Sequence, residues 1–181
     1  MKWKYLVMMS LIMIVFSINI SYASEKNLTK KVVSIVYDDS GSMFWNNNYC
    51  YSNYALQILT ASMGKEDILN IVKMSDPFTN NEINLSTENK KQSYIDEIKK
   101  YQHVANTPFE AIDTAKNWLL DICKTYKDDA IYWFVVITDG DFENPPNNFF
   151  YFFEDINSEF NNVNYEFVFL SIGNNTSSDV K

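Results

Sequence analysis

Four apolar runs dominate the sequence and restrict the folds that are open to it. They are rich in β-branched and aromatic residues and cover Val32–Tyr37, Asp67–Met74, Ala130–Ile137 and Val163–Ile172. Strands that are apolar along most of their length are typical of a sheet that is covered on both faces. Segments with helical spacing lie between these runs. Strands that alternate with helices predict a mostly parallel sheet in an α/β fold.

The segments between the apolar runs supply the expected helices and one further strand. The helices are expected at Tyr54–Met63, at Ser93–Tyr101, from Thr107 onward, and at about Phe149–Phe160. Thr107, Pro108 and Glu110 form a capping-box signature at the start of the third helix. Turn residues in Pro77–Asn81 and the alternating run Ile83–Leu85 predict a hairpin with the second strand. The sequence therefore predicts a Rossmann-like, three-layer α/β/α fold whose mostly parallel central sheet has one antiparallel edge strand.

Residues 1–23 have the pattern of an export signal. Lys2 and Lys4 precede an apolar run, and Ser21-Tyr22-Ala23 is a small-residue cleavage pattern. The run is too short, and too closely followed by that pattern, to be preferred as a membrane span, although an uncleaved anchor is the alternative. We therefore expect a signal peptide over residues 1–23 and a secreted or extracytoplasmic product.

The rest of the chain has the length of one domain. We expect a polar leader over residues 24–31 and a single domain over residues 32–181. The formal net charge of the chain is -8, and it becomes more negative when Lys2 and Lys4 leave with the signal peptide. The sequence also contains no arginine for fork-shaped contacts to phosphate. Nucleic acid is therefore not expected as a partner.

Cys50 and Cys123 are the two cysteines of the chain. Cys50 is expected beside the start of one helix and Cys123 about 16 residues, or roughly 24 Å, down another. A disulfide needs Cα atoms within about 7 Å of each other. The spacing predicts a buried thiol at Cys123 and leaves the state of Cys50 open.

Oxygen-bearing side chains follow two of the predicted strands. Asp38 comes directly after the first strand, with Ser40 and Ser42 in the next turn, and Asp139 follows the strand Ala130–Ile137. Ligands of such sheets bind outside the carboxyl ends of the strands. A hard divalent cation such as Mg²⁺ or Mn²⁺ prefers oxygen ligands. Zinc is not expected, because His103 is the only histidine and the cysteines are not at ligand spacing.

Three pieces of this pattern resemble a known family. Asp38-Asp39-Ser40-Gly41-Ser42-Met43 is similar to the Asp-x-Ser-Gly-Ser-Met form of the metal-ion-dependent adhesion site of von Willebrand factor type A domains. Thr107 matches the single Thr that this family has in a later loop. Thr138-Asp139-Gly140 matches its Thr-Asp-Gly at the end of the fourth strand. Their order and rough spacing along the chain also agree with the family.

The resemblance implies a metal site and a binding function. Ser40, Ser42 and Thr107 would touch the cation, and Asp38 and Asp139 would act directly or through waters. The cation, Mg²⁺ or else Mn²⁺ or Ca²⁺, would attract an Asp or Glu of a protein partner. The resemblance thus implies an adhesion or assembly module that performs no chemistry on its partner, and no enzyme.

Two other functions compete with this hypothesis. A Mg²⁺-dependent phosphotransferase or hydrolase could use Asp38 as its nucleophile, but haloacid dehalogenase-like enzymes need a second Asp at the position that Ser40 occupies here. A structural domain without metal could keep the motif because acidic and hydroxyl side chains bond their own backbone in turns. For Thr107, helix capping is the competing explanation. We interpret Asp39, together with Asp141 and Glu143, as solvated turn carboxylates.

Two features depart from the family or are not explained by it. Type A domains usually continue past the fifth strand with a helix and an edge strand, whereas this sequence ends at Lys181, so the domain is expected to be truncated or reduced. Aromatic residues gather at Phe149–Phe153 and, beside the metal motif, at Phe44, Trp45, Tyr49 and Tyr51. We expect most of them to pack against the core and some to extend a binding surface.

Overall fold

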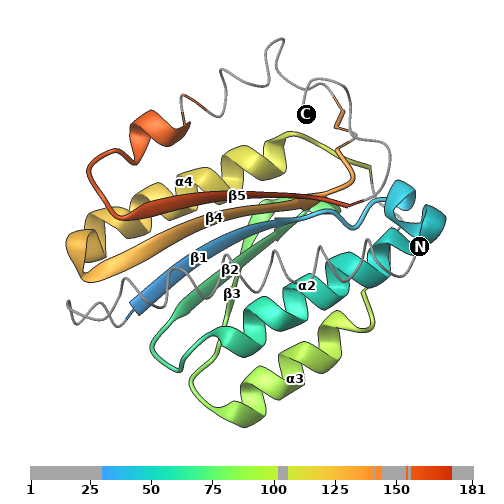
Figure 1. The fold of residues 1–181 in the computed structure, drawn as a ribbon, viewed down its shortest axis with the longest axis horizontal. Helices are drawn as coiled ribbons and strands as arrows, with labels where there is room; N and C mark the ends of the chain where they lie inside the picture. Colours follow the sequence, from blue (N-terminus) through green and yellow to red (C-terminus); the bar gives the residue numbers. More distant parts are fainter. Residues whose placement is uncertain (1–29, 102–105, 141, 144–153, 155, 173–181) are drawn as a thin grey trace, which may run out of the picture.

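Five strands form one sheet in the computed structural model, which describes residues 30–101, 106–140, 142–143, 154 and 156–172 (Figure 1). The strands are β1 (Lys30–Tyr37), β2 (Ile68–Lys73), β3 (Asp76–Ile83), β4 (Ala130–Thr138) and β5 (Tyr165–Ser171). Their order across the sheet is β3-β2-β1-β4-β5. Only β3 runs antiparallel to its neighbour; β1 is parallel to β2 and β4, and β4 is parallel to β5. The predicted mostly parallel sheet with one antiparallel edge strand is confirmed.

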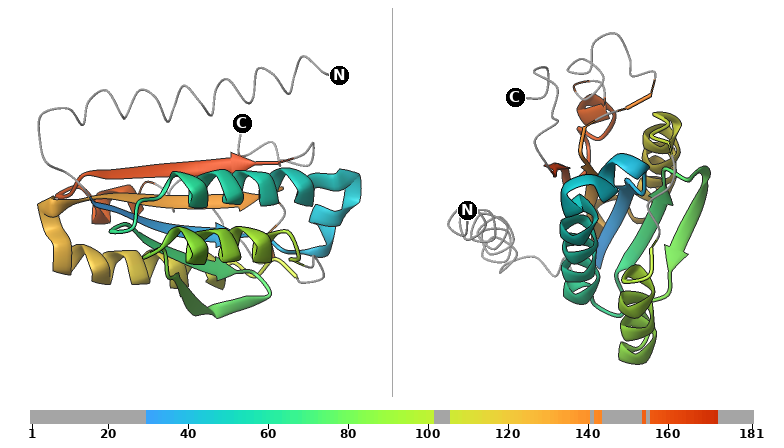
Figure 2. Two further views of the ribbon diagram at one scale, coloured as in Figure 1. Left: turned by 90° about the horizontal axis from the view of Figure 1, so that it is seen from below. Right: turned by 90° about the vertical axis from the view of Figure 1, so that its right-hand side faces the viewer.

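Helices cover both faces of the sheet, as Figures 1 and 2 show. The helical elements are the 3₁₀ helix η1 (Gly41–Asn47), the α-helices α2 (Asn48–Ser62), α3 (Glu88–Ile98) and α4 (Glu110–Tyr126), and the short 3₁₀ helix η2 (Lys127–Asp129). Successive side chains of a strand point to opposite faces. In β1, Val32 and Val36 therefore join the core under α4, and Val33 and Ile35 join the core under α2 and α3. This is the predicted three-layer α/β/α arrangement.

The hairpin between β2 and β3 has its turn earlier than the sequence indicates. The turn lies at Met74–Ser75, and Pro77–Asn81 belongs to strand β3 instead of forming the turn. Pro77 is tolerated because β3 is an edge strand and exposes most of its residues. The backbone N–H of Ser75 donates to Asp39 Oδ1 over 2.8 Å, and this contact, distant in sequence, helps to hold the turn.

Several other elements begin earlier than predicted. Strand β1 starts at Lys30, inside the predicted leader, because Lys30 and Lys31 pair with the first residues of β4. Helix α2 starts at Asn48 instead of Tyr54, since the Tyr37 hydroxyl bonds Ser52 and Asn53 in its first turns. Helix α3 starts at Glu88, where the Thr87 hydroxyl accepts the N–H of Lys90 over 3.3 Å. This Thr cap was visible in the sequence and was missed.

Both cysteines in the structure are free. Cys50 is exposed at the start of α2 and Cys123 is buried in α4. The predicted absence of a bond between them and the predicted burial of Cys123 are confirmed. Cys123 packs in the core under α4. Burial raises the pKa of its thiol to about 12, so it stays protonated near neutral pH.

Several sequence features lie outside the described residues. These are the predicted signal peptide over residues 1–23, most of the predicted leader over residues 24–31, the aromatic run Phe149–Phe153, His103 and Asp141. Of the helix expected at Phe149–Phe160, residues 156–159 are described and are helical, and Ile156 and Phe160 are buried in the core under α4. Within the described parts of the chain, no helix has the length and the apolar character that crossing a membrane would need.

Candidate metal site

Asp38 joins the ends of two neighbouring strands. It follows β1, its backbone N–H donates to Ile137 O of β4 over 3.0 Å, and its side chain is completely buried. Its Oδ1 atom accepts the N–H of Ser40 over 2.9 Å, and its Oδ2 atom accepts the hydroxyl of Thr138 over 2.7 Å. Both oxygens are thus held in place by neighbours that are distant in sequence or lie in the next turn. Thr138 was noted in the sequence only as a match to the family pattern, and its contact with Asp38 was not foreseen.

Ser40 and Ser42 bring two hydroxyl oxygens together beside Asp38. Ser40 is buried, Ser42 is half-buried, and their Oγ atoms lie 2.9 Å apart. Ser40 is the residue before η1, but its side chain does not cap this helix. Neighbouring ligand positions of an octahedral Mg²⁺, with bonds of about 2.0–2.1 Å, lie about 2.9 Å apart. The two hydroxyls therefore fit two adjacent positions of such an ion.

Asp139 follows β4 and is completely buried. The next residue, Gly140, has a φ of 92°, in the region that favours glycine. Its N–H donates to the Thr138 hydroxyl over 3.0 Å, so the turn after β4 closes on the same hydroxyl that bonds Asp38. The Thr-Asp-Gly sequence thus has a conformational reason for its glycine. It sets Asp139 beside the Asp38 turn.

The carboxyl group of Asp38 lies in an environment that disfavours its charge. Burial raises its pKa, and the negative charge of Asp139 raises it further. Hydrogen bonds from Ser40 and Thr138 oppose this effect and lower the pKa of Asp38, but the net shift is upward. Two acidic side chains thus share a buried site. A divalent cation would compensate their charge, which supports the fit between these residues and a metal.

Thr107 does not cap α4, and this corrects the capping-box prediction. The residue before α4 is Phe109, in helical conformation and without a side-chain cap. The carbonyl of Thr107 instead accepts the N–H of Glu143 over 2.9 Å, and the rings of Phe109 and Phe142 meet edge to face. These contacts draw the buried Thr107 toward the segment that follows β4 and Asp139. Helix capping therefore does not explain why a Thr stands at position 107. The role of Thr107 as a metal ligand stays a prediction.

Asp39 is a structural residue and no solvated turn carboxylate. It is 4% exposed, and it accepts both the backbone N–H and the hydroxyl of Ser75. It therefore joins the end of β1 to the β2–β3 turn. The pattern of turn residues gave no signal for this contact, because Ser75 is distant in sequence. Glu143, which was interpreted in the same way, is exposed.

The donor set determines which cation could bind. Among the described residues, no group of three or more His, Cys, Asp and Glu side chains is placed to hold a metal. This disfavours a site of nitrogen, sulfur or many carboxylates. The structure does bring Asp38, Ser40, Ser42 and Asp139 to one end of the sheet, with hydroxyls as half of the set. Such a set suits a hard cation that also keeps waters.

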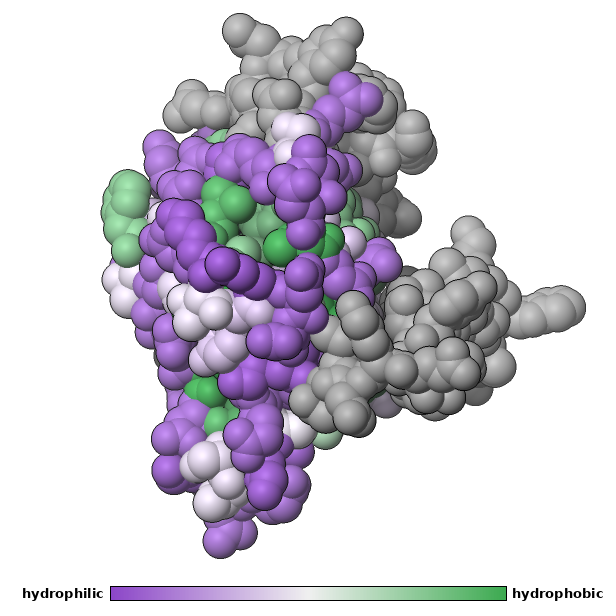
Figure 3. Space-filling model, turned by 90° about the vertical axis from the view of Figure 1, so that its left-hand side faces the viewer, coloured by the Kyte–Doolittle hydropathy of each residue, from purple (hydrophilic) through white to green (hydrophobic). Residues whose placement is uncertain are grey.

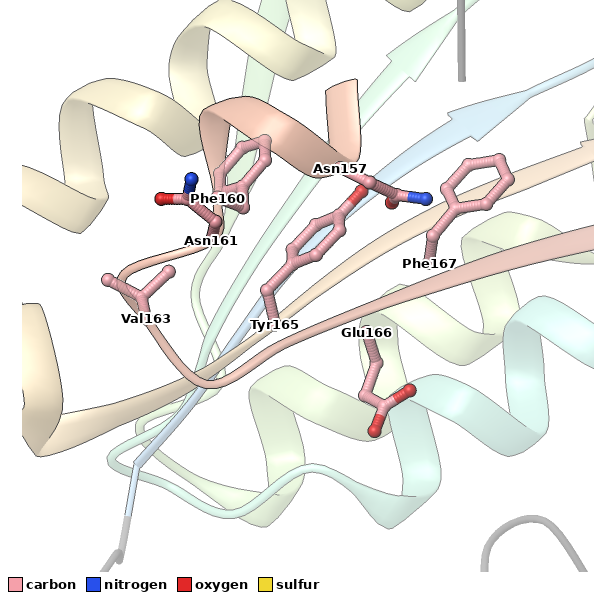
Figure 4. A pocket seen from close by; sticks show the side chains of 7 residues that line it. All are labelled: Asn157, Phe160, Asn161, Val163, Tyr165, Glu166 and Phe167. Atoms are coloured by element: carbon pink, nitrogen blue, oxygen red, sulfur yellow. The ribbon is translucent and has the colours of Figure 1, made fainter. Parts of the chain in front are cut away.

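A hollow lies at the other end of β5, where this strand begins. It has a volume of about 460 Å³ and is lined by Asn157, Phe160, Asn161, Val163, Tyr165, Glu166 and Phe167 (Figure 4). Phe160 and Tyr165 stack with ring centroids 4.3 Å apart, and Glu166 points to the opposite side of the strand. This hollow contributes nothing to the candidate metal site. Figure 3 views the molecule from the side at which β1, β4 and β5 begin in Figure 1, and most of this surface is hydrophilic, with small apolar patches.

Comparisons with known proteins show the fold and not a family. No family model matches the sequence, and no curated protein is detectably similar to it. The structure is similar to that of the manganese-loaded TRAP protein of Plasmodium vivax, with a TM-score of 0.54 and 16% sequence identity. The match covers 82% of this chain and 60% of the TRAP chain. It supports a type A-like α/β fold, as the resemblance of the sequence motifs implied.

Weaker similarities exist to two other solved structures. The pilus adhesin SpaC of Lactobacillus rhamnosus GG has a TM-score of 0.40 and 10% identity over 61% of this chain and 14% of its own. Proximal thread matrix protein 1 of the mussel byssus has a TM-score of 0.47 and 13% identity over 77% of this chain and 37% of its own. These scores are too low to support an argument about this protein.

Proposed function

We propose that this chain is a secreted, type A-like module that binds a protein partner through a divalent cation. Asp38, Ser40, Ser42, Thr107 and Asp139 hold Mg²⁺, Mn²⁺ or Ca²⁺ at the carboxyl end of the sheet. The observation that carries the proposal is the pair of Ser40 and Ser42 hydroxyls, 2.9 Å apart, beside the buried Asp38. The manganese in the TRAP structure of the same fold is consistent with such an ion.

The roles of the side chains follow from their contacts. Both oxygens of Asp38 already accept hydrogen bonds, so Asp38 acts mainly by orienting Ser40 and Thr138 and by supplying negative charge. Ser40 and Ser42 are neutral ligands. A cation with few charged ligands in direct contact keeps more of its own charge and offers a position to a partner's carboxylate. The proposed partner is therefore a protein that supplies an Asp or Glu side chain.

The enzymatic alternative receives no support from the position of Asp38. A nucleophilic carboxylate needs an oxygen that a substrate can reach. Asp38 is buried, and each of its oxygens is hydrogen-bonded. Incubation with Mg²⁺ and a generic phosphate ester tests the point directly. Turnover that disappears in Asp38→Ala would contradict the binding function.

Thermal unfolding in the presence of Mg²⁺ or Mn²⁺ tests the metal site. A ligand that binds only the folded state stabilises it by about 2.7 kcal/mol at 100 times its Kd. For a domain of this size we expect the Tm to rise by roughly 5–10 °C. Ser40→Ala and Ser42→Ala should lose this rise, while Ser86→Ala, on an exposed loop, should keep it.

The outcome shows whether the motif binds a metal or has only a structural role. If the parent protein does not respond to any of the three cations, the domain is the metal-free structural alternative. If Ser40→Ala and Ser42→Ala respond like the parent, the cation binds elsewhere. A far-ultraviolet circular dichroism spectrum of each variant serves as the control for folding.

A second titration tests the open position for a carboxylate. Acetate stands in for the partner's Asp or Glu side chain and is added to the protein in saturating Mg²⁺, with chloride at the same concentration as the control. We expect acetate to raise the Tm further in the parent and not in Ser42→Ala. An equal effect of acetate without Mg²⁺ would show that the carboxylate does not bind through the cation.

A further inference from the structure

Phe44 is an exposed aromatic residue directly beside the proposed metal site. It follows the proposed ligand Ser42 by two positions in η1, which lies beyond the carboxyl end of β1 in Figure 1. Met43, between them, is completely buried in the core under α2 and α3. A 3₁₀ helix has three residues per turn, so the three side chains point in different directions. Because Met43 points inward, Ser42 and Phe44 lie on the outer half of η1.

The ring of Phe44 is supported by its neighbours although most of the side chain is exposed. Phe44 is 62% exposed, and its ring stacks on Tyr49 with the centroids 5.6 Å apart and an angle of 10° between the rings. Tyr49 in turn packs against the core under α2 and α3. An aromatic side chain that is already ordered loses little conformational entropy when a partner contacts it. Phe44 thus has the properties of a contact residue.

The segment around Phe44 indicates which kind of side chain its ring would accept. The sequence from Ser40 to Gly64 has no Asp, Glu, Lys, Arg or His. A charged side chain of a partner would lose water on this segment without meeting an opposite charge in it. An apolar side chain instead gains from burial against the ring. The surroundings of Phe44 therefore favour an apolar contact.

A partner bound through the proposed cation comes close to Phe44. Two metal–oxygen bonds of about 2.1 Å each place the partner's carboxylate oxygen within about 4 Å of the Ser42 hydroxyl. Consecutive Cα atoms of the partner are about 3.8 Å apart. The residues next to its Asp or Glu therefore lie within about one side-chain length of η1. The cation contact thus determines what covers the exposed ring, namely the same partner segment.

We propose that Phe44 is a specificity-determining residue, and that the partner carries an apolar residue directly beside the Asp or Glu that binds the cation; this rests on the proposed function. The carboxylate takes the open position of the cation, and the apolar side chain packs on the ring of Phe44. The pair of contacts selects an acidic residue with an apolar neighbour over an acidic residue with polar neighbours.

Capped dipeptides in saturating Mg²⁺ test the proposal on protein expressed from the full chain. Ac-Asp-Phe-NH₂ and Ac-Phe-Asp-NH₂ carry a carboxylate and an apolar group in both orders. Ac-Asp-Gly-NH₂ and Ac-Gly-Asp-NH₂ carry the carboxylate alone, and Ac-Asn-Phe-NH₂ carries the ring alone. The rise of the Tm with peptide concentration gives each Kd. We expect at least one acidic Phe peptide to bind about three- to tenfold more tightly than its Gly counterpart, and Ac-Asn-Phe-NH₂ to show no Mg²⁺-dependent binding.

Three variants locate the apolar contact. Phe44→Ser should bind the Phe and Gly peptides equally, while it keeps the response to Mg²⁺ and the affinity for the Gly peptides. Tyr54→Ser and Phe78→Ser are the matched controls, because Tyr54 is 50% exposed on α2 and Phe78 is 75% exposed on β3. Both should keep the preference of the parent. Far-ultraviolet circular dichroism of each variant shows whether it is folded.

The results distinguish the apolar contact from the metal site. Equal binding of Phe and Gly peptides by the parent, or an unchanged preference in Phe44→Ser, overturns the apolar contact and leaves the proposed function standing. If no acidic peptide binds in a Mg²⁺-dependent manner, the proposed function fails and the apolar contact fails with it. A Phe44-dependent preference for Ac-Asp-Lys-NH₂ over Ac-Asp-Phe-NH₂ also overturns the proposal, because the ring would then bind a cationic side chain.

Discussion

The charge of Asp38 has opposite effects on stability and on the proposed function of this domain. Burial of the charge destabilises the fold, whereas the proposed cation site needs it. The Asp38 carboxyl group orients Ser40 and Thr138 and brings negative charge to the proposed cation site. Burial, and then the charge of Asp139, raises its pKa. A carboxyl group that binds its proton more tightly in the folded than in the unfolded chain stabilises the fold at low pH. This contribution is lost as the pH rises through the folded pKa.

We therefore predict that Asp38→Asn is more stable than the parent at neutral pH without divalent cations. The amide keeps the shape of the side chain and removes the buried charge. Its oxygen can accept the N–H of Ser40, and its NH₂ group can donate to the Thr138 hydroxyl oxygen in place of the bond that Asp38 accepts. The difference in the free energy of unfolding should shrink toward acid pH, where Asp38 is protonated in the parent. Urea denaturation in EDTA at several pH values measures it. A variant that is less stable than the parent at neutral pH would show that the charge is already compensated within the protein.

Gly140 is the second residue with a specific physical requirement. Its φ of 92° is strained for any residue with a Cβ atom, and its N–H bonds the Thr138 hydroxyl. We predict that Gly140→Ala lowers the free energy of unfolding by about 1–2 kcal/mol. Gly41→Ala is the control, because a Cβ atom there would meet no other atom within 4 Å. Equal losses in both variants, measured by urea denaturation, would contradict the argument.

At the scale of elements, Asp67 fastens the start of β1 to the end of α2. Its Oδ1 accepts the N–H of Lys31 and its Oδ2 the N–H of Gly64, both over 2.7 Å. Its side chain is 4% exposed. The Lys31 ammonium, 3.6 Å from Oδ2, is much more exposed and contributes less than these two backbone bonds.

Replacement of Asp67 should therefore loosen the start of β1 and the end of α2 together. We predict that Asp67→Ala lowers the free energy of unfolding by about 3 kcal/mol, because two backbone N–H groups lose a charged acceptor. Glu66→Ala is the matched control, since its side chain is 71% exposed and lies 4.0 Å from Lys65. Hydrogen exchange of the Lys31 and Gly64 amides should accelerate in Asp67→Ala and not in Glu66→Ala. Unchanged exchange would mean that neighbouring contacts hold these ends.

The elements also show where local sequence signals stop being sufficient. The apolar strands were predicted almost to their ends, because burial on both faces requires an apolar run whatever surrounds it. The β2–β3 turn was placed too late, because Asp39 contacts Ser75 and the polar β3 is an edge strand. The start of α4 was placed too early, because Thr107 pairs with Glu143 instead of capping the helix.

At the scale of the whole molecule, the net charge of -8 gives added salt a second way to stabilise the fold, besides binding of a cation at one site. Monovalent salt screens the repulsion among surface carboxylates and stabilises an acidic protein in general. We predict that NaCl raises the Tm of the parent and of Ser42→Ala equally. At matched ionic strength, Mg²⁺ should raise the Tm further only in the parent. If Mg²⁺ and NaCl act alike in both proteins, screening explains the stabilisation and no specific site is needed.

The sequence by itself determined the layers of this protein and the end of the sheet at which the polar motif lies. Apolar runs demand a sheet with both faces covered, and residues that follow parallel strands gather at one edge. Only the tertiary structure decided three contacts. Thr138 bonds Asp38, Asp39 is buried against Ser75, and the carbonyl of Thr107 accepts the N–H of Glu143. Each of these contacts joins residues far apart in the chain. Their energies depend on burial and on exact approach, which local patterns of residue types do not encode.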